Sequence, residues 1–329
     1  MEHYDGMRNL GIDLLRILAI FTVVVIHTAS GDIAYRDGVL HYMPLANACF
    51  AFLAGWFLFN PSAKVLSLRD VGGLLVKRLK RLVFPYLVWE GIYVLANIGF
   101  DLMSGKFTPP AATDWIGIVF LGAGSVQLWF VATLIYVQVV LCAMMALFAI
   151  VDITKPLRHD ICVIILFNLI GGAMLLWREF GIESDYLRRF VFLLGYGALG
   201  IGLRFACSKV QSGSSIMGIV FLAGVCGIVV SFVWNIPEIV SVLSWCMAFG
   251  GLSVLTQLRN IVVTASNCVM GIYLCHVLFT CLIAMSVPMT SKIITNGYII
   301  VLANAIVGFT VSLIFVYCIK RTRLAKWLF

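Results

Sequence analysis

Long apolar runs constrain the fold of this chain more than any other feature of its sequence. Several of them approach the roughly 20 residues that an α-helix needs to cross a bilayer. Ten such runs can be outlined, and they cover residues 10–29, 42–59, 82–100, 128–151, 161–177, 190–205, 215–234, 239–255, 266–286 and 298–317. We therefore predict an all-α fold, a polytopic membrane bundle of about ten transmembrane helices that forms one integral-membrane domain over residues 1–329.

The composition agrees with this class of protein. The chain is 62% hydrophobic and only 12% charged, whereas soluble domains carry about twice that charged fraction. The apolar stretch at residues 114–124 is short and rich in glycine, and we expect an interfacial or re-entrant segment there. No loop is long enough for a separate soluble domain, so any chemistry is expected from the membrane bundle itself.

The distribution of Lys and Arg predicts how the chain is oriented. With the N-terminus inside, 16 of the 23 Lys and Arg residues lie on the inner side, six lie on the outer side and Arg16 lies within a span. Positive residues favour the cytoplasmic side, so we expect both termini in the cytoplasm. The net charge of +8 then reflects orientation and anionic membrane lipids, and we expect no nucleic acid partner.

The ten cysteines indicate neither a disulfide framework nor a metal site. Nearly all of them lie within apolar runs, and no C-x-x-C pair occurs. This pattern is typical of small buried side chains. We therefore expect no metal.

The first span carries Asp13, Arg16 and His27, and charge within a membrane is costly and usually functional. Eleven steps of about 100° bring Arg16 and His27 to nearly the same helix face, while about 1.5 Å per residue separates them by about 16 Å. They are therefore expected to bind two parts of one long ligand. The alternative is structural: Asp13 and Arg16 form an i,i+3 pair that holds the bundle together, and His27 merely lies at the interface.

Other polar residues lie in or beside later spans. Arg78 and Arg81 belong to a basic cluster before the third span, which is either a positive-inside anchor or an arginine clamp for phosphate. Glu90 needs a partner or a water-filled cavity, unless it is protonated and simply packed. Trp129 is either an interfacial aromatic residue or part of a pocket mouth. His276 is either a satisfied core residue or shares a site with His27.

Together these residues resemble the bacterial membrane-bound acyltransferase-3 family. Its R-x10-H hallmark, with Asp three residues before the Arg, is matched by Asp13, Arg16 and His27. Further matches are the second-span segment 50–56, the basic residues Arg78 and Arg81 followed by Pro85 and Tyr86, the L-W-F segment 128–130, and the Y-L-x-H segment 273–276. Two positions depart from the family: Ala54 replaces a usual serine, and Gln127 replaces a usual histidine.

The resemblance implies transfer of an acyl group, often acetyl, from cytosolic acyl-CoA to a sugar hydroxyl of a glycan or its lipid-linked precursor. It implies a stand-alone enzyme of the bacterial cytoplasmic (inner) membrane that takes part in O-acetylation during polysaccharide biosynthesis. In this scheme Arg16, Arg78 and Arg81 meet the donor, and His27 is the general base. Asp13 orients Arg16, while Glu90, Trp129 and His276 shape the pocket or stabilise the oxyanion.

Three alternatives stay open at this point. His27 could instead carry the acyl group covalently. The chain could be a transporter or flippase for a lipid-linked saccharide, or a non-catalytic partner of a glycan synthase. The sequence does not fix the acyl group or the sugar, and association into a homo-oligomer is left open.

Overall fold

The computed structural model describes residues 9–29, 46–59, 67–106, 109, 111–150, 156–179, 184–208, 214–234, 238–251, 258–290 and 297–329. Within these ranges the regular structure is helical, without a strand. The helices are α1 (Leu10–Thr28), α3 (Ala46–Trp56), α4 (Leu68–Met103), α5 (Ala112–Leu121), α6 (Leu128–Ile150), α7 (Pro156–Glu179), α8 (Asp185–Ser208), α9 (Ser214–Trp234), α10 (Glu238–Gly251), α11 (Arg259–Thr290), α12 (Gly297–Ile319) and α13 (Ala325–Leu328).

The predicted all-α polytopic class is confirmed. Among the described residues, seven helices are long and apolar enough to cross a membrane: α1, α4, α6, α7, α8, α11 and α12. Three shorter apolar stretches lie in α3, α9 and α10, where the remaining three spans were expected. The stretch expected to be interfacial or re-entrant, residues 114–124, overlaps the ten-residue helix α5.

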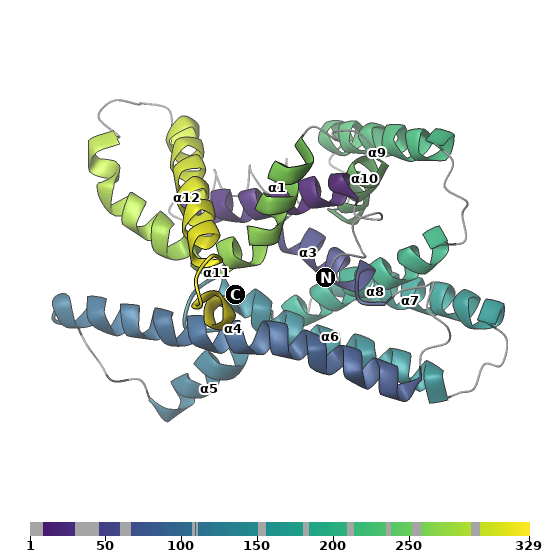
Figure 1. The fold of residues 1–329 in the computed structure, drawn as a ribbon, viewed down its shortest axis with the longest axis horizontal. Helices are drawn as coiled ribbons and strands as arrows, with labels where there is room; N and C mark the ends of the chain where they lie inside the picture. Colours follow the sequence, from purple (N-terminus) through teal and green to yellow (C-terminus); the bar gives the residue numbers. More distant parts are fainter. Residues whose placement is uncertain are drawn as a thin grey trace. The chain divides into compact units, whose positions relative to one another are not determined.

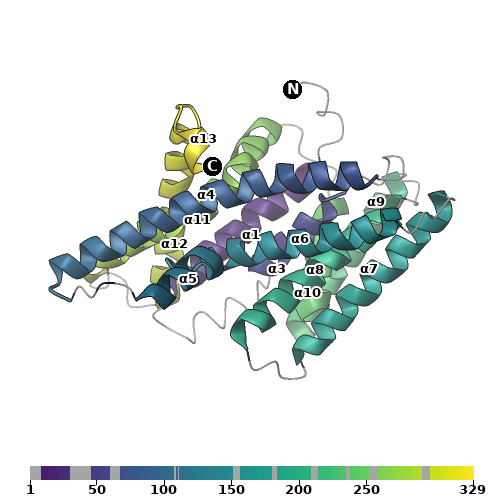
Figure 2. The same cartoon turned by 90° about the horizontal axis from the view of Figure 1, so that it is seen from below.

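The helices form two compact units, each made from two stretches of chain. The first unit comprises Met1–Phe50 and Gln211–Thr322, and in it α1 packs against α10, α11 and α12 while α9 packs against α10 (Figure 1). The second comprises Ala51–Val210 and Arg323–Phe329. There α4 and α8 both pack on α6, and α7 runs along α8 (Figure 2).

Helix α4 begins earlier than the span predicted at residues 82–100. It starts at Leu68, where Ser67 and Asp70 form a reciprocal capping box, and it continues through Pro85 to Met103. Lys and Arg are good helix formers, so the basic cluster around Arg78 and Arg81 is helical and does not form a loop. The capping residues satisfy backbone N–H groups that would otherwise lack partners, which fixes the early start.

Glycines allow helices to approach closely within the second unit. A Cβ atom added at Gly55 of α3 would lie 1.9 Å from the carbonyl oxygen of Gly197 in α8, and one at Gly200 would lie 2.1 Å from that of Phe52. Real side chains do not tolerate such distances, so only glycine fits at these positions. Small residues at a crossing are the usual means of bringing membrane helices into contact.

The short helix α13 packs on α4 (Figure 2). The indole Nε1 of the buried Trp89 donates a hydrogen bond to the carbonyl oxygen of Leu328 at 2.9 Å. The rings of Phe84 and Trp327 lie 5.3 Å apart between centroids, and Phe329 stacks on Trp89 at 6.3 Å. The last residues thus pack against α4 of the second unit, although no residue of α13 is itself buried.

Candidate functional site

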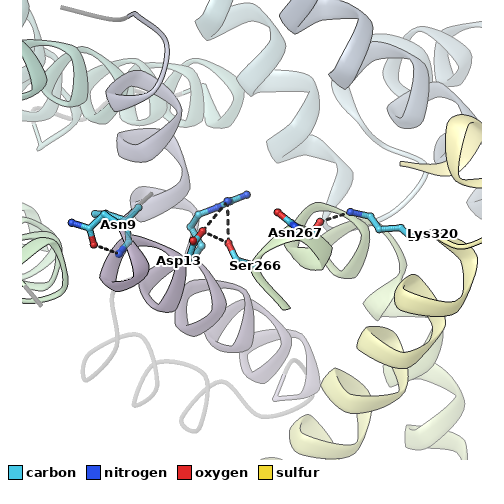
Figure 3. A network of polar contacts seen from close by, with 7 residues as sticks. Asn9, Asp13, Ser266, Asn267 and Lys320 are labelled. Atoms are coloured by element: carbon cyan, nitrogen blue, oxygen red, sulfur yellow. Dashed lines mark hydrogen bonds and ion pairs between the residues drawn. The ribbon is translucent and has the colours of Figure 1, made fainter. Parts of the chain in front are cut away.

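Helix α1 is anchored at its beginning by Asn9. The side-chain oxygen of Asn9 accepts a hydrogen bond from the backbone N–H of Ile12 at 3.2 Å, which is an ordinary N-cap. Its Nδ2 donates to the carbonyl oxygen of Gly250 in α10 at 2.9 Å. This double contact fixes the first turn of α1 against α10 and thereby places Asp13 one turn further on. Figure 3 shows Asn9 and Asp13 on α1.

Asp13 and Arg16 form the predicted i,i+3 ion pair, with 3.6 Å between Nη1 and Oδ1. A third residue, Ser266 of α11, joins them. Its Oγ donates to Oδ1 of Asp13 at 2.5 Å and accepts from Nη1 of Arg16 at 3.1 Å (Figure 3). Asp13 and Ser266 are buried, whereas the Arg16 side chain remains 33% exposed. The network therefore holds a guanidinium in place while leaving part of it accessible.

Lys320 lies close to the same network. It follows α12, and its Nζ donates a hydrogen bond to the carbonyl oxygen of Asn267, the neighbour of Ser266 (Figure 3). Burial lowers the pKa of Lys320, and the charge of Arg16 lowers it further, against the opposing effect of Cys268. The influence of Arg16 on Lys320 indicates that two cationic side chains share this region, which is an arrangement that favours an anion.

His27 and His276 meet at the other end of α1. Their ring centroids are 5.1 Å apart and their planes are tilted by 49°. His276 comes from α11 and is completely buried. The histidine pair predicted as a shared site is therefore brought together, and α1 and α11 run in the same direction, with Arg16 beside Ser266 and His27 beside His276.

The surroundings of the histidine pair come partly from α3. The hydroxyl group of Tyr273 donates to Oδ1 of Asn47 at 3.4 Å, and the Tyr273 ring lies edge-on to Phe50 at 6.2 Å and to His276 at 5.9 Å. Tyr273 and Cys49 are buried. The segments 50–56 and 273–276, which the sequence set apart, thus have members in contact within the first unit.

The remaining candidates lie on α4 and α6 of the second unit. Arg78 donates a hydrogen bond to the carbonyl oxygen of Phe57, just after α3, whereas Arg81 is exposed. Their expected contact with the same ligand as Arg16 stays a prediction. An arginine engaged by a carbonyl group beside an exposed arginine is compatible with either an anchor or a phosphate clamp.

Glu90 is buried next to the glycine-rich turn before α6. A Cβ atom at Gly124 would lie 1.9 Å from Oε2 of Glu90, so any larger residue at position 124 would force this buried carboxyl group to move. Within the described residues, neither carboxyl oxygen of Glu90 has a hydrogen-bond partner by geometric criteria. Tyr86, one turn earlier, instead donates to the carbonyl oxygens of Ile118 and Val119, both at 3.0 Å.

Trp129 is paired with a cationic residue from another helix. The guanidinium of Arg189, from α8, lies 4.7 Å above the Trp129 ring. The same arginine lies 3.8 Å from a carboxylate oxygen of Asp185. Gln127, at the position of a usual histidine, is fully buried and accepts a hydrogen bond from Ser125 at 2.6 Å.

Sequence reasoning missed Ser266, Asn47 and Lys320, because a lone serine, asparagine or terminal lysine carries no pattern of its own. The only available signal was that Ser266 is a polar residue close to the beginning of an apolar run. Among the described residues, no group of three or more His, Cys, Asp or Glu is arranged to hold a metal ion.

Comparison with known proteins gives one clear finding. A family model described as an acyltransferase domain matches residues 9–321, which includes α1, the histidine pair and the Asp13–Arg16–Ser266 network. No curated protein and no solved structure matches the chain.

Proposed function

We propose that this chain, which belongs to the acyltransferase-3 family of membrane proteins, transfers an acyl group from cytosolic acyl-CoA to a hydroxyl group of a sugar. The acyl group that we propose is acetyl, and the acceptor is a surface polysaccharide or its lipid-linked precursor. The single observation that carries this proposal is the position of His27, on the same helix as the Asp13–Arg16 pair and beside His276.

His27 is the proposed general base. It removes the proton from the acceptor hydroxyl group while the hydroxyl oxygen attacks the carbonyl carbon of the thioester. The carbon–sulfur bond then breaks, and the proton on His27 passes to the leaving thiolate, so that no proton is gained or lost overall. Histidine suits this task because its neutral imidazole ring can accept a proton at one nitrogen and release it again.

Arg16 is the proposed contact for an anionic part of the donor. Its guanidinium is held by Asp13 and Ser266 but remains partly exposed, and Lys320 adds positive charge nearby. Arginine matches phosphate groups with a rigid fork of N–H donors. About 16 Å of helix separates Arg16 from His27, which suits an elongated donor. Arg78 and Arg81 are proposed as further phosphate ligands.

The decisive experiment measures transfer from radiolabelled acetyl-CoA by the purified protein, with a glycan and glycolipid extract of the source cells as acceptor. We expect His27→Ala to lose transfer by at least about 100-fold, with normal insertion and thermal stability. Thr28→Val is the matched control, since among the described residues the Thr28 hydroxyl group donates to the carbonyl oxygen of Val24 in its own helix. Full activity of His27→Ala would eliminate this catalytic role.

Binding of the donor is tested separately. Saturable binding of labelled acetyl-CoA that is weakened in Arg16→Ala is expected of an acyltransferase. A transporter or flippase would instead move a lipid-linked saccharide without any dependence on acyl-CoA, and a non-catalytic partner would tolerate both Arg16→Ala and His27→Ala.

The proposed location is the bacterial cytoplasmic membrane, with both termini in the cytoplasm. The excess of Lys and Arg on one side of the predicted spans supports this orientation. A reporter fused after Phe329 that is active only in the cytoplasm should give signal. A signal from a reporter active only outside the membrane would reverse the orientation.

A further inference from the structure

The tautomer of His276 is fixed by its own helix. Nδ1 of His276 lies 2.8 Å from the carbonyl oxygen of Tyr273 and 3.1 Å from that of Ile272. Carbonyl oxygens only accept hydrogen bonds, so Nδ1 must carry the hydrogen. In the neutral ring, Nε2 then presents a lone pair.

That lone pair is buried without a partner. His276 is completely buried, and among the described residues its Nε2 has no hydrogen bond. Buried polar atoms are usually hydrogen-bonded, and an exception calls for an explanation. Among the described residues, the rings in contact with His276 are those of Tyr273 and His27, and the Tyr273 hydroxyl group is directed to Asn47.

We propose that His276 is a positioning residue, whose Nε2 accepts a hydrogen bond from a ring N–H of His27 when substrate is bound. This inference rests on the proposed function of His27 as the base. With one nitrogen of His27 held as a donor to His276, the other nitrogen must carry the lone pair that takes the acceptor proton. The 5.1 Å between ring centroids allows this contact after a small rotation, and catalytic hydrogen bonds often tighten only in the substrate complex.

In this scheme His276 neither takes up nor releases a proton. When His27 takes the hydroxyl proton, it becomes an imidazolium ion with two N–H groups, of which one remains directed at Nε2 of His276. The second proton then leaves for the thiolate, and both histidines return to their starting states. His276 thereby selects the tautomer of the base and supports its transient charge, as the orienting member of a catalytic triad does.

Two conservative variants separate this role from a purely structural one. The amide of Gln reaches the position of Nε2, whereas that of Asn reaches the position of Nδ1. His276→Gln therefore keeps an acceptor for His27 and loses the donor to the α11 carbonyl groups, while His276→Asn does the opposite. His276→Leu removes both functions.

The experiment measures kcat and the KM for labelled acetyl-CoA with the same acceptor extract. We expect His276→Gln to stay within about fivefold of the wild-type kcat, and His276→Asn and His276→Leu to fall by at least about 30-fold, all with unchanged donor KM. If Asn keeps wild-type turnover, or if folded Gln protein is as inactive as Leu, the positioning role is overturned. Should the Asn variant fail to fold, the comparison of Gln with Leu decides.

The His27→Ala variant distinguishes a failure of the proposed base, His27, from a failure of the proposed positioning residue, His276. Loss of transfer in His27→Ala together with full activity of His276→Asn would overturn only the role of His276. Full activity of His27→Ala would overturn the proposed base, and with it any need to orient that residue.

Discussion

Arg16 donates a hydrogen bond to Ser266 across 250 residues of chain, at 3.1 Å. Because Ser266 also donates to Asp13, one small hydroxyl group joins two opposite charges to a second helix. The i,i+3 pair alone would stabilise only α1. With Ser266 included, the charged pair is also a contact between α1 and α11, so the structural and functional interpretations of Arg16 are compatible.

Ser266→Ala should destabilise the protein and weaken donor binding together. The substitution leaves the buried carboxylate of Asp13 without this donor, which costs about 1–3 kcal/mol, and it removes a contact that holds Arg16. Thermal unfolding in detergent and labelled acetyl-CoA binding measure the two effects. Thr22→Val is the control, because within the described part of the chain the buried Thr22 hydroxyl donates to Leu18 of its own helix. An equal loss in both variants would contradict the proposed importance of the network.

Gly55→Ala should disrupt the contact between α3 and α8. Its Cβ would lie 1.9 Å from a backbone oxygen, so the helices must separate, at a cost of about 1–3 kcal/mol or more. Gly91→Ala in α4 is the matched control, because no atom of the described residues lies within 4 Å of its added Cβ and alanine favours a helix by about 0.5–1 kcal/mol. A melting temperature of Gly55→Ala equal to that of Gly91→Ala would refute the close crossing.

Glu90→Gln should be better tolerated than Gly124→Ala. A buried carboxylate without a hydrogen-bond partner is costly when charged, and the amide has nearly the same shape; we expect a change in unfolding free energy below about 1 kcal/mol. In Gly124→Ala, the new Cβ collides with the carboxyl group, and a larger loss follows. The double variant Glu90→Ala with Gly124→Ala should recover part of that loss, whereas additive losses would exclude a direct collision.

Arg189 and Trp129 should show a measurable coupling. A double-mutant cycle with Arg189→Gln and Trp129→Leu is expected to give about 0.5–1 kcal/mol, since the guanidinium lies 4.7 Å above the ring. The unfolding midpoints of the four proteins supply this value. A coupling energy near zero would return Arg189 to the role of a simple interfacial anchor.

The sequence predicted helices more reliably than their partners. Hydropathy located the helices because an apolar run is a local property of one segment. The R-x10-H spacing placed Arg16 and His27 on one helix face because helical periodicity is local as well. The predicted span at residues 82–100 lies within α4, but the early beginning of the helix at Leu68 was not predicted, because hydropathy does not detect the charged first turns. The capping pair Ser67 and Asp70 was the sequence signal for that beginning.

Contacts between distant helices were beyond this kind of inference. Nothing in the residues around Ser266 distinguishes it from a serine that bonds to its own helix, because its role depends on what α1 presents to it. For His276, the sequence suggested that it partners His27. The two carbonyl groups of α11 near Nδ1, which only the structure shows, determine which ring nitrogen carries the lone pair.

The hydrogen bonds of Asp13 and Arg16 to Ser266 can form only after Ser266 has been synthesised, long after the first helix. At about 5–20 residues per second, a ribosome needs roughly 12–50 s to add the 250 residues that separate Arg16 from Ser266. During that interval Asp13 and Arg16 lack their hydrogen bonds to Ser266. A nascent chain arrested before α11 should therefore be a preferred target for membrane quality control.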